Sequence, residues 1–262
     1  MKFKCCEWAL SHLVINSDDL TYCCASFDKQ LKFIENYHGE NIDIEKYTIN
    51  RENYIYKCKT GNFPDVCKDC PTLEERDWDE SIGFIDVNIS NRTYCSCDCI
   101  YCIISGGGDK ELKKDLNTKN VYDVKPMLTH LKENKMFKKG CHFIIGGGEC
   151  AEYPKGELKW LIDFVFSVNG SIEFLSSGIT YSKDIEQALK SGIAKLKVSV
   201  DAGTKRVYEQ VKRVKGYDNV WKNLKKYIDA TKKNQNSQVI IKYILIPGIN
   251  DKEKEIKEFT EK

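Results

Sequence analysis

The 262-residue chain lacks the features that mark membrane-spanning, secreted or nucleic-acid-binding proteins. It has no run of about 18 apolar residues, the minimum for a membrane span. Its start, Met1–Cys6, contains no apolar core of a signal peptide. Lys and Arg number 41 and Asp and Glu 39, and the resulting net charge of +2 gives no electrostatic reason to expect a nucleic acid or an anionic membrane as partner. The sequence therefore predicts a cytoplasmic protein.

Cysteine, in contrast, is abundant, with 13 residues. In a reducing compartment disulfides are rare, and grouped cysteines more often bind metal or catalyse. The cysteines are also unevenly distributed, with most of them in the first 102 residues and only two further on: Cys5, Cys6, Cys23, Cys24, Cys58, Cys67, Cys70, Cys95, Cys97, Cys99, Cys102, then Cys141 and Cys150. This distribution is typical of metal sites.

Three of these cysteines, Cys95, Cys99 and Cys102, follow a predicted strand at Phe84–Ile89 with the spacing C-x3-C-x2-C. Thiolates are the usual ligands of iron–sulfur clusters, and three of them leave one iron of a cubane open. By itself the spacing also fits half a zinc site or a set of buried thiols. With Tyr101 directly before the third cysteine, the loop resembles the cluster-binding motif of the radical S-adenosylmethionine (SAM) enzymes.

From residue 81 onward, strand-like apolar runs alternate with helical patterns, which predicts an α/β fold with βα units around a parallel sheet. The predicted strands are Phe84–Ile89, Cys141–Ile145, Ile172–Leu175, Leu196–Val200 and Val239–Ile246. The predicted helices are Pro126–Asn134, Glu157–Val168, Lys183–Lys190, Lys205–Val211 and Asn219–Thr231. The resemblance implies a partial (β/α)6-type radical SAM barrel over residues 81–262. A sixth strand is not visible, and the sequence ends inside the helix expected after the fifth strand.

Polar or glycine-rich residues follow these strands, where parallel barrels build their active sites. Gly147, Gly148 and Glu149 resemble the GGE motif that holds the SAM amino group, although a glycine-rich strand end can also be a simple turn. Ser199 and Asp201 resemble the segment that faces the ribose and methionine part of SAM, and Asp201 could equally cap the next helix. The resemblance implies a SAM site that also includes Tyr101 and Ser177.

Residues 1–75 show no long helical periodicity and are expected to form a small cysteine-rich module. We expect a short strand through Leu10–Ile15, a turn at Asp18-Asp19, a helical or irregular stretch at 30–37, and a linker over 71–80. The module resembles SPASM, which holds an auxiliary [4Fe–4S] cluster and normally follows the barrel. On that resemblance the expected ligands are Cys5, Cys23, Cys67 and Cys70, with Cys6, Cys24 and Cys58 as alternates. A four-cysteine zinc site has the same ligand chemistry and stays open.

The resemblance implies an enzyme that uses a [4Fe–4S] cluster to cleave SAM reductively into methionine and a 5′-deoxyadenosyl radical, which abstracts hydrogen from a substrate carbon. It implies an oxidation or modification of a peptide or a small polar, sugar-like substrate, aided by the auxiliary cluster. A reductant such as flavodoxin or ferredoxin would be the protein partner. Two alternatives remain at this point: a zinc-stapled binding protein without turnover, and an electron-transfer iron–sulfur protein.

Overall fold

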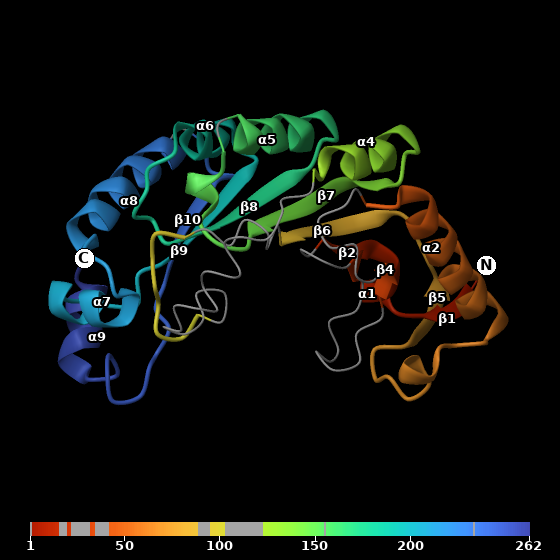
Figure 1. The fold of residues 1–262 in the computed structure, drawn as a ribbon, viewed down its shortest axis with the longest axis horizontal. Coiled ribbons are helices and arrows are strands. Elements are labelled where there is room, and N and C mark those ends of the chain that lie inside the picture. Colours follow the sequence, from red (N-terminus) through yellow and green to blue (C-terminus); the bar gives the residue numbers. More distant parts are fainter. Residues whose placement is uncertain are drawn as a thin grey trace. The chain divides into compact units, whose positions relative to one another are not determined.

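A computed structural model describes residues 2–15, 20–21, 32–34, 42–88, 95–102, 123–154, 156–232 and 234–262 of the chain (Figure 1). The chain forms two compact units that alternate along the sequence. The first unit comprises Met1–Ile89, Asn120–Phe143 and Val168–Gly170. The second unit comprises Ser90–Lys119, Ile144–Ser167 and Ser171–Lys262. Within the described residues, no helix combines the length and the apolar character that crossing a membrane requires.

The described part of the first unit contains strands and helices of different lengths, of which helix α2 (Ile44–Thr60) is the longest. Its elements are β1 (Lys2–Cys5), α1 (Glu7–Ser11), β2 (His12–Ile15), β3 (Leu20–Thr21), β4 (Lys32–Ile34), α2 (Ile44–Thr60), the 3-10 helix η1 (Asp65–Cys67), β5 (Glu74–Asp77), β6 (Ile82–Asn88), α4 (Lys125–Glu133) and the first part of β7 (Phe137–Gly146). Strand β2 pairs parallel with β6 and antiparallel with β3, and β3 pairs antiparallel with β4. Strand β1 pairs antiparallel with β5 in a separate two-stranded sheet.

Helix α2 contradicts the expectation that residues 1–75 contain no long helix, since it spans 17 residues. Its buried face consists of Tyr47, Arg51, Tyr54, Ile55 and Cys58, which recur at helical spacing but are largely aromatic or polar. A search for aliphatic periodicity therefore misses it. The end signals were present in the sequence: the Asp43 carboxylate accepts from Lys46 N at 2.9 Å, and Gly61 ends the helix with φ 74°.

Three further expectations for the first unit were wrong. Leu10 lies in α1 rather than in a strand, and β2 begins only at His12. Glu74–Asp77, predicted to lie in a linker, form strand β5 because they pair with β1. Lys32–Ile34 form strand β4 within the stretch expected to be helical or irregular, whereas the rest of that stretch and the Asp18-Asp19 turn lie outside the described residues.

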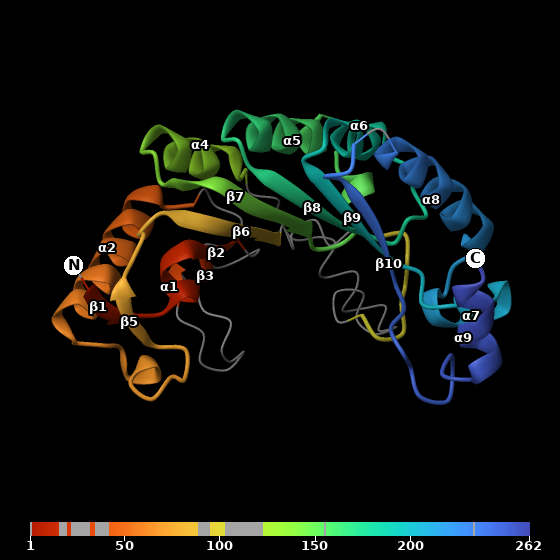
Figure 2. The same cartoon turned by 180° about the vertical axis from the view of Figure 1, so that it is seen from behind.

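The second unit has the predicted alternation of strands and helices. After the end of β7 come the 3-10 helix η4 (Cys150–Glu152), α5 (Glu157–Ser167), β8 (Ser171–Ser176), α6 (Lys183–Ser191), β9 (Ala194–Ser199), α7 (Lys205–Lys212), α8 (Tyr217–Thr231), β10 (Gln238–Lys242) and α9 (Glu253–Thr260). Strand β9 pairs parallel with both β8 and β10. Helices α5, α6 and α8 cover one face of these strands (Figures 1 and 2). An α/β fold with a mostly parallel sheet is thus confirmed, and the partial (β/α)6-type barrel stays a prediction.

Strand β10 ends four residues before the predicted end at Ile246. Beyond Lys242 the backbone bonds to side chains instead of to a neighbouring strand: Ile244 N donates to Asp201 Oδ1 at 2.7 Å, and Ile246 N donates to Asn250 Oδ1 at 2.6 Å. The strand therefore ends where its backbone begins to bond to the side chains of Asp201 and Asn250.

Candidate active site

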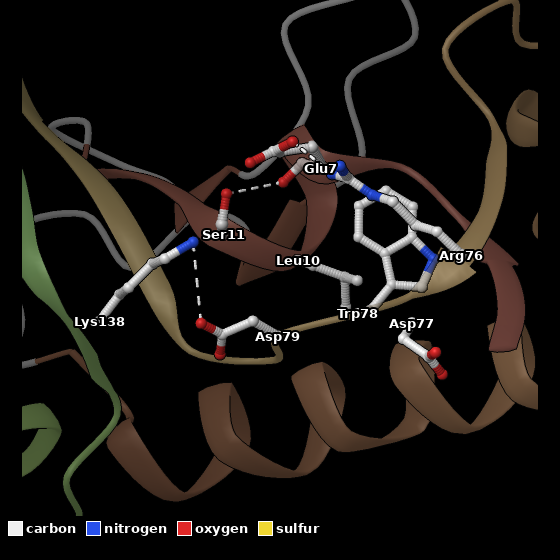
Figure 3. Close-up of a pocket in the computed structure, with 8 residues that line it drawn as sticks. All are labelled: Glu7, Leu10, Ser11, Arg76, Asp77, Trp78, Asp79 and Lys138. Atoms are coloured by element: carbon white, nitrogen blue, oxygen red, sulfur yellow. Dashed lines mark hydrogen bonds and ion pairs between the residues drawn. The ribbon is translucent and has the colours of Figure 1, made fainter. Parts of the chain in front are cut away.

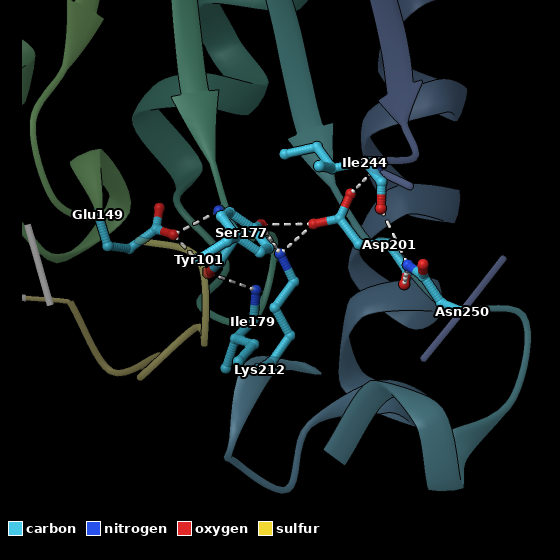
Figure 4. Close-up of polar contacts among 8 residues, drawn as sticks. All are labelled: Tyr101, Glu149, Ser177, Ile179, Asp201, Lys212, Ile244 and Asn250. Carbon is cyan, nitrogen blue, oxygen red and sulfur yellow. Dashed lines mark hydrogen bonds and ion pairs between the residues drawn. The ribbon is translucent and has the colours of Figure 1, made fainter. Parts of the chain in front are cut away.

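Glu149 lies at the end of β7 with its side chain fully buried. Gly147 and Gly148 precede it with φ of 77° and 90°, a conformation that glycine adopts without strain. The Oε1 atom accepts from Ser176 Oγ at 2.7 Å and from Ala151 N at 3.1 Å. The Oε2 atom accepts from Ser177 N at 2.7 Å and from Ser177 Oγ (Figure 4). Burial raises the pKa of Glu149, and these four hydrogen bonds oppose that rise because they favour the carboxylate. The result is a carboxylate held in one orientation.

Asp201 is the centre of a second polar group, formed with Tyr101 and Lys212. Its Oδ2 atom accepts from Tyr101 OH and from Lys212 Nζ, both at 2.5 Å, and Lys212 Nζ lies 2.7 Å from Tyr101 OH (Figure 4). Asp201 has φ 59°, a left-handed conformation that is uncommon for a residue other than glycine. Such strain persists only where surrounding contacts hold it, and it is concentrated at functional sites.

Asp201 does not cap the helix that follows it, so that alternative is settled. Thr204 is the N-cap of α7, and its Oγ1 accepts from Val207 N at 3.4 Å. The carbonyl of Asp201 instead accepts from Asn250 Nδ2 at 2.8 Å. Asp201 is therefore held from both the side chain and the backbone, with its carboxylate turned toward Tyr101.

The cysteine loop at residues 95–102 packs on the C-terminal end of α7. Asp98 N donates to Lys212 O and Ile100 N donates to Val211 O, each at 3.0 Å. On its other side, Ser96 N donates to Glu152 Oε2 at 3.1 Å. These contacts fix the loop backbone at several points.

Within this loop the thiol of Cys99 has a lowered pKa. A hydrogen bond from Cys97 and the positive charge of Lys212 lower the pKa of Cys99 to about 7, although burial opposes the shift. The thiolate is the form that binds metal. Across the described residues, no three His, Cys, Asp or Glu side chains converge to hold one metal ion. In a cubane each thiolate binds its own iron, so convergence on one point is not required there.

The remaining predicted SAM-site residues are found in this region, together with others that the sequence did not reveal. Ser199 ends β9 and is half-buried. Lys212 is a buried cation that the sequence did not reveal, whereas the neighbouring Arg213 is exposed. Asn250 is also fully buried; its Nδ2 donates to Asp201 O, 49 residues earlier, and its Oδ1 accepts from the nearby Ile246 N. Cys150 is buried, and burial raises the pKa of its thiol well above the usual value, so it is poorly reactive.

The predicted auxiliary ligands lie in the first unit, except for Cys23, which is outside the described residues, as is Cys24. Cys5 is buried on β1 and hydrogen-bonds to Cys58 on α2, one of the predicted alternates. This bond raises the pKa of Cys5 and lowers that of Cys58. Cys67 and Cys70 are joined by a turn in which Cys70 N donates to Cys67 O at 3.1 Å.

A second link in the same region passes through Thr72. Its Oγ1 lies 3.2 Å from Cys6 Sγ and 3.1 Å from Cys70 Sγ. The thiols of Cys5 and Cys58, and those of Cys6 and Cys70 through Thr72, therefore lie in small hydrogen-bonded groups, and a role of these cysteines as metal ligands stays a prediction.

The first unit also has a surface pocket of about 160 Å³ that none of the predicted site residues lines (Figure 3). Arg76 lies over the ring of Trp78, 3.9 Å from its centroid, and pairs with Glu7. Pockets for drug-sized ligands are typically about 300–1,000 Å³. This pocket is too small for such a ligand, and its charged groups are already paired, so we do not assign it a function.

Residues 92–260 match the family profile of the radical SAM superfamily. The match covers more than half of the chain, which therefore belongs to the radical SAM superfamily. No curated protein matches the chain.

Among solved structures, the chain resembles SuiB of Streptococcus suis bound to the precursor peptide SuiA, with 12% identity, a TM-score of 0.50, and coverage of 81% of this chain and 50% of that chain. The structure of SuiB bound to S-adenosylmethionine gives 11% identity, a TM-score of 0.48, and coverage of 82% and 50%. A radical SAM methyltransferase from Sphaerobacter thermophilus has 17% identity and a TM-score of 0.46, and the match covers 64% of this chain and 49% of that chain. The chain thus spans about half the length of these proteins, and the first likeness shows a shared fold.

The family implies a [4Fe–4S] cluster and SAM as cofactors, and the donor set of the second unit fits both. Cys95, Cys99 and Cys102 supply three thiols on one anchored loop, and one of them ionises near neutral pH. Glu149 supplies a buried carboxylate, the group that an ammonium such as that of SAM requires.

Proposed function

We propose that the chain is a radical SAM enzyme that cleaves SAM reductively and abstracts hydrogen from a carbon of a peptide or small polar substrate. The observation that carries this proposal is the buried Glu149 carboxylate, fixed by hydrogen bonds at the end of β7. A buried carboxylate is costly to keep unless a cation pairs with it when the site is in use. Together with the cysteine loop, it supplies the two anchors that this chemistry needs.

Cys95, Cys99 and Cys102 would hold the cluster through their thiolates. When bound, the cluster supplies the electron that cleaves SAM. Glu149 would accept hydrogen bonds from the SAM ammonium group, and Ser177, whose backbone N and hydroxyl both donate to the carboxylate, would keep it oriented. Orientation of this kind lowers the barrier because the entropic cost of alignment is met before the reaction.

Asp201 and Tyr101 form the other wall of the proposed site. Asp201 is fully buried and accepts from Tyr101 OH at 2.5 Å, so water does not reach its carboxylate. Gly147, Gly148 and Ser199 would line the SAM site through backbone and small polar groups. In this arrangement the chain orients the cofactor and excludes water, while the cofactors carry the difficult chemistry.

We propose that the substrate is a peptide and that the reaction oxidises or otherwise modifies it. A small polar or sugar-like molecule is the second candidate substrate. The SuiB structure with its precursor peptide supports the peptide. We also propose that the first unit holds an auxiliary [4Fe–4S] cluster. Its support is the cysteine content of the region, with Cys5, Cys67 and Cys70 among the predicted ligands together with Cys23. A flavodoxin or ferredoxin would be the reductant.

The test is 5′-deoxyadenosine formation by anaerobically reconstituted protein with SAM and dithionite, measured by mass spectrometry. Cys99→Ala should abolish it. Glu149→Gln should weaken SAM binding roughly ten- to hundredfold, because a hydrogen bond to a charged group contributes about 1.5–3 kcal/mol. The matched control is Glu253→Gln, on an exposed position at the start of α9, which should cleave SAM normally. Colourless, zinc-loaded protein would instead indicate a binding protein, and brown protein without SAM cleavage an electron carrier.

A further inference from the structure

Lys212 is a buried cation that belongs neither to the cysteine motif nor to the SAM-site residues predicted from the sequence. It is the last residue of α7, and the residue is 1% exposed. Burying an ammonium group is costly unless it is paired and hydrogen-bonded. Lys212 meets this condition with Asp201 Oδ2 at 2.5 Å and Tyr101 OH at 2.7 Å.

Lys212 also contacts the cysteine loop through its backbone. Its carbonyl oxygen accepts from Asp98 N at 3.0 Å, between Cys97 and Cys99 in the loop. Its ammonium lies 5.2 Å from the centroid of the Tyr101 ring, in the same loop before Cys102. One residue therefore joins the loop by the backbone at one end and by the side chain at the other.

The charge of Lys212 acts on the loop as well as its hydrogen bonds. Both the Lys212 ammonium and the Asp201 carboxylate contact Tyr101 OH, and Tyr101 directly precedes Cys102 in the loop. Both charged groups are almost completely buried, so water screens neither of them well. A cation and an anion thus contribute with opposite signs to the electrostatic potential at the cysteine loop.

We propose that Lys212 is a positioning residue that anchors the cysteine loop and raises the reduction potential of the cluster bound there. This inference rests on the proposed function for the presence of the cluster. A nearby positive charge favours the state with one more electron, and the Asp201 carboxylate disfavours it. Hydrogen bonding and net charge around the sulfurs are recognised determinants of cluster potentials.

The experiment is a redox titration of reconstituted protein without SAM, monitored by the EPR signal that disappears in Cys99→Ala. Lys212→Gln should shift the one-electron equilibrium toward the oxidised cluster about tenfold, which corresponds to about 59 mV. Lys212→Arg keeps the charge, and its one-electron equilibrium should stay within about twofold of that of the wild type. Asp201→Asn should shift the equilibrium in the opposite direction. Lys205→Gln, at the exposed start of the same helix, is the control and should leave the potential unchanged.

An unchanged potential in Lys212→Gln would overturn the proposal, as would a failure of Arg to restore it. Should Lys212→Gln fail to bind the cluster, Asp201→Asn decides alone: a shift toward the oxidised form contradicts the charge argument. Protein that holds a cluster and shows these shifts but never cleaves SAM would refute the proposed enzyme while supporting the role of Lys212. Protein that binds no cluster at all would overturn both.

Discussion

Removal of the Lys212 ammonium by Lys212→Met should destabilise the second unit strongly. The side chains of Lys212 and Asp201 are 2% and 0% exposed, so the substitution leaves a carboxylate buried without its cation. Breaking a buried ion pair from one side costs about 3–5 kcal/mol. Asp201 keeps the hydrogen bonds from Tyr101 OH and Ile244 N, so we expect the lower end, about 3 kcal/mol. The free energy of unfolding of a typical protein is about 5–15 kcal/mol, so this loss is a large part of the total stability.

The assay combines urea unfolding of metal-free protein with hydrogen–deuterium exchange at the Ile244 amide, which donates to Asp201. The exchange measurement reports the region directly, since the chain has two units and global unfolding need not be two-state. The control is Lys205→Met, because Lys205 and Asp218 form a surface pair with side chains 58% and 74% exposed. Such pairs contribute about 0–1 kcal/mol, and the control should stay within that range.

The double variant Lys212→Met/Asp201→Asn separates the pair from its surroundings. With both charges removed, its loss of stability should be smaller than the sum of the two single losses, by about 0.5–3 kcal/mol. Exchange at Ile244 should slow correspondingly relative to Lys212→Met. The reasoning is refuted when Lys212→Met stays within about 0.5 kcal/mol of the wild type, or when the double variant loses as much as the two singles together.

Three other predictions follow from the geometry. Because burial raises the pKa of Glu149, the folded protein keeps this proton at a higher pH than the unfolded chain. The wild type should therefore lose stability relative to Glu149→Gln as pH rises from about 4.3 through the folded pKa. A difference in urea midpoint between the two proteins that is the same at every pH would contradict this. In metal-free protein, the pH dependence of Cys99 alkylation, followed by peptide mass spectrometry, should give an apparent pKa of about 7, and Lys212→Met should raise this pKa. A wild-type profile centred near 8.5, the usual thiol pKa, would contradict the described loop. Asp43→Ala should cost about 1 kcal/mol and speed hydrogen exchange at Lys46, whereas Asp43→Asn, which retains an acceptor, should have little effect; identical exchange in both would show that the cap is not formed.

The sequence alone was sufficient for features that depend on short-range pattern. The spacing of Cys95, Cys99 and Cys102 and the Gly-Gly-Glu segment led to the family, which the profile match confirms. The strands and helices of the second unit were also predictable within a few residues, because parallel strands and their covering helices carry strong apolar periodicity. Helix α2 shows the limit of this approach: its buried face contains Arg51, which donates to Leu10 O at 2.9 Å and so needs a partner that no local pattern reveals.

Only the tertiary structure decided which of two adjacent cations faces inward. Lys212 is the last residue of α7, and Arg213 follows it as the C-cap with φ 55°. Lys212 is buried and Arg213 is exposed. Asp201 likewise obtains its partners from a loop a hundred residues earlier and a backbone amide 43 residues later. Residue type and spacing determined which chemical groups the chain carries, whereas the packing of distant segments determined which of those groups meet, because buried charges are stable only where their partners are brought to them.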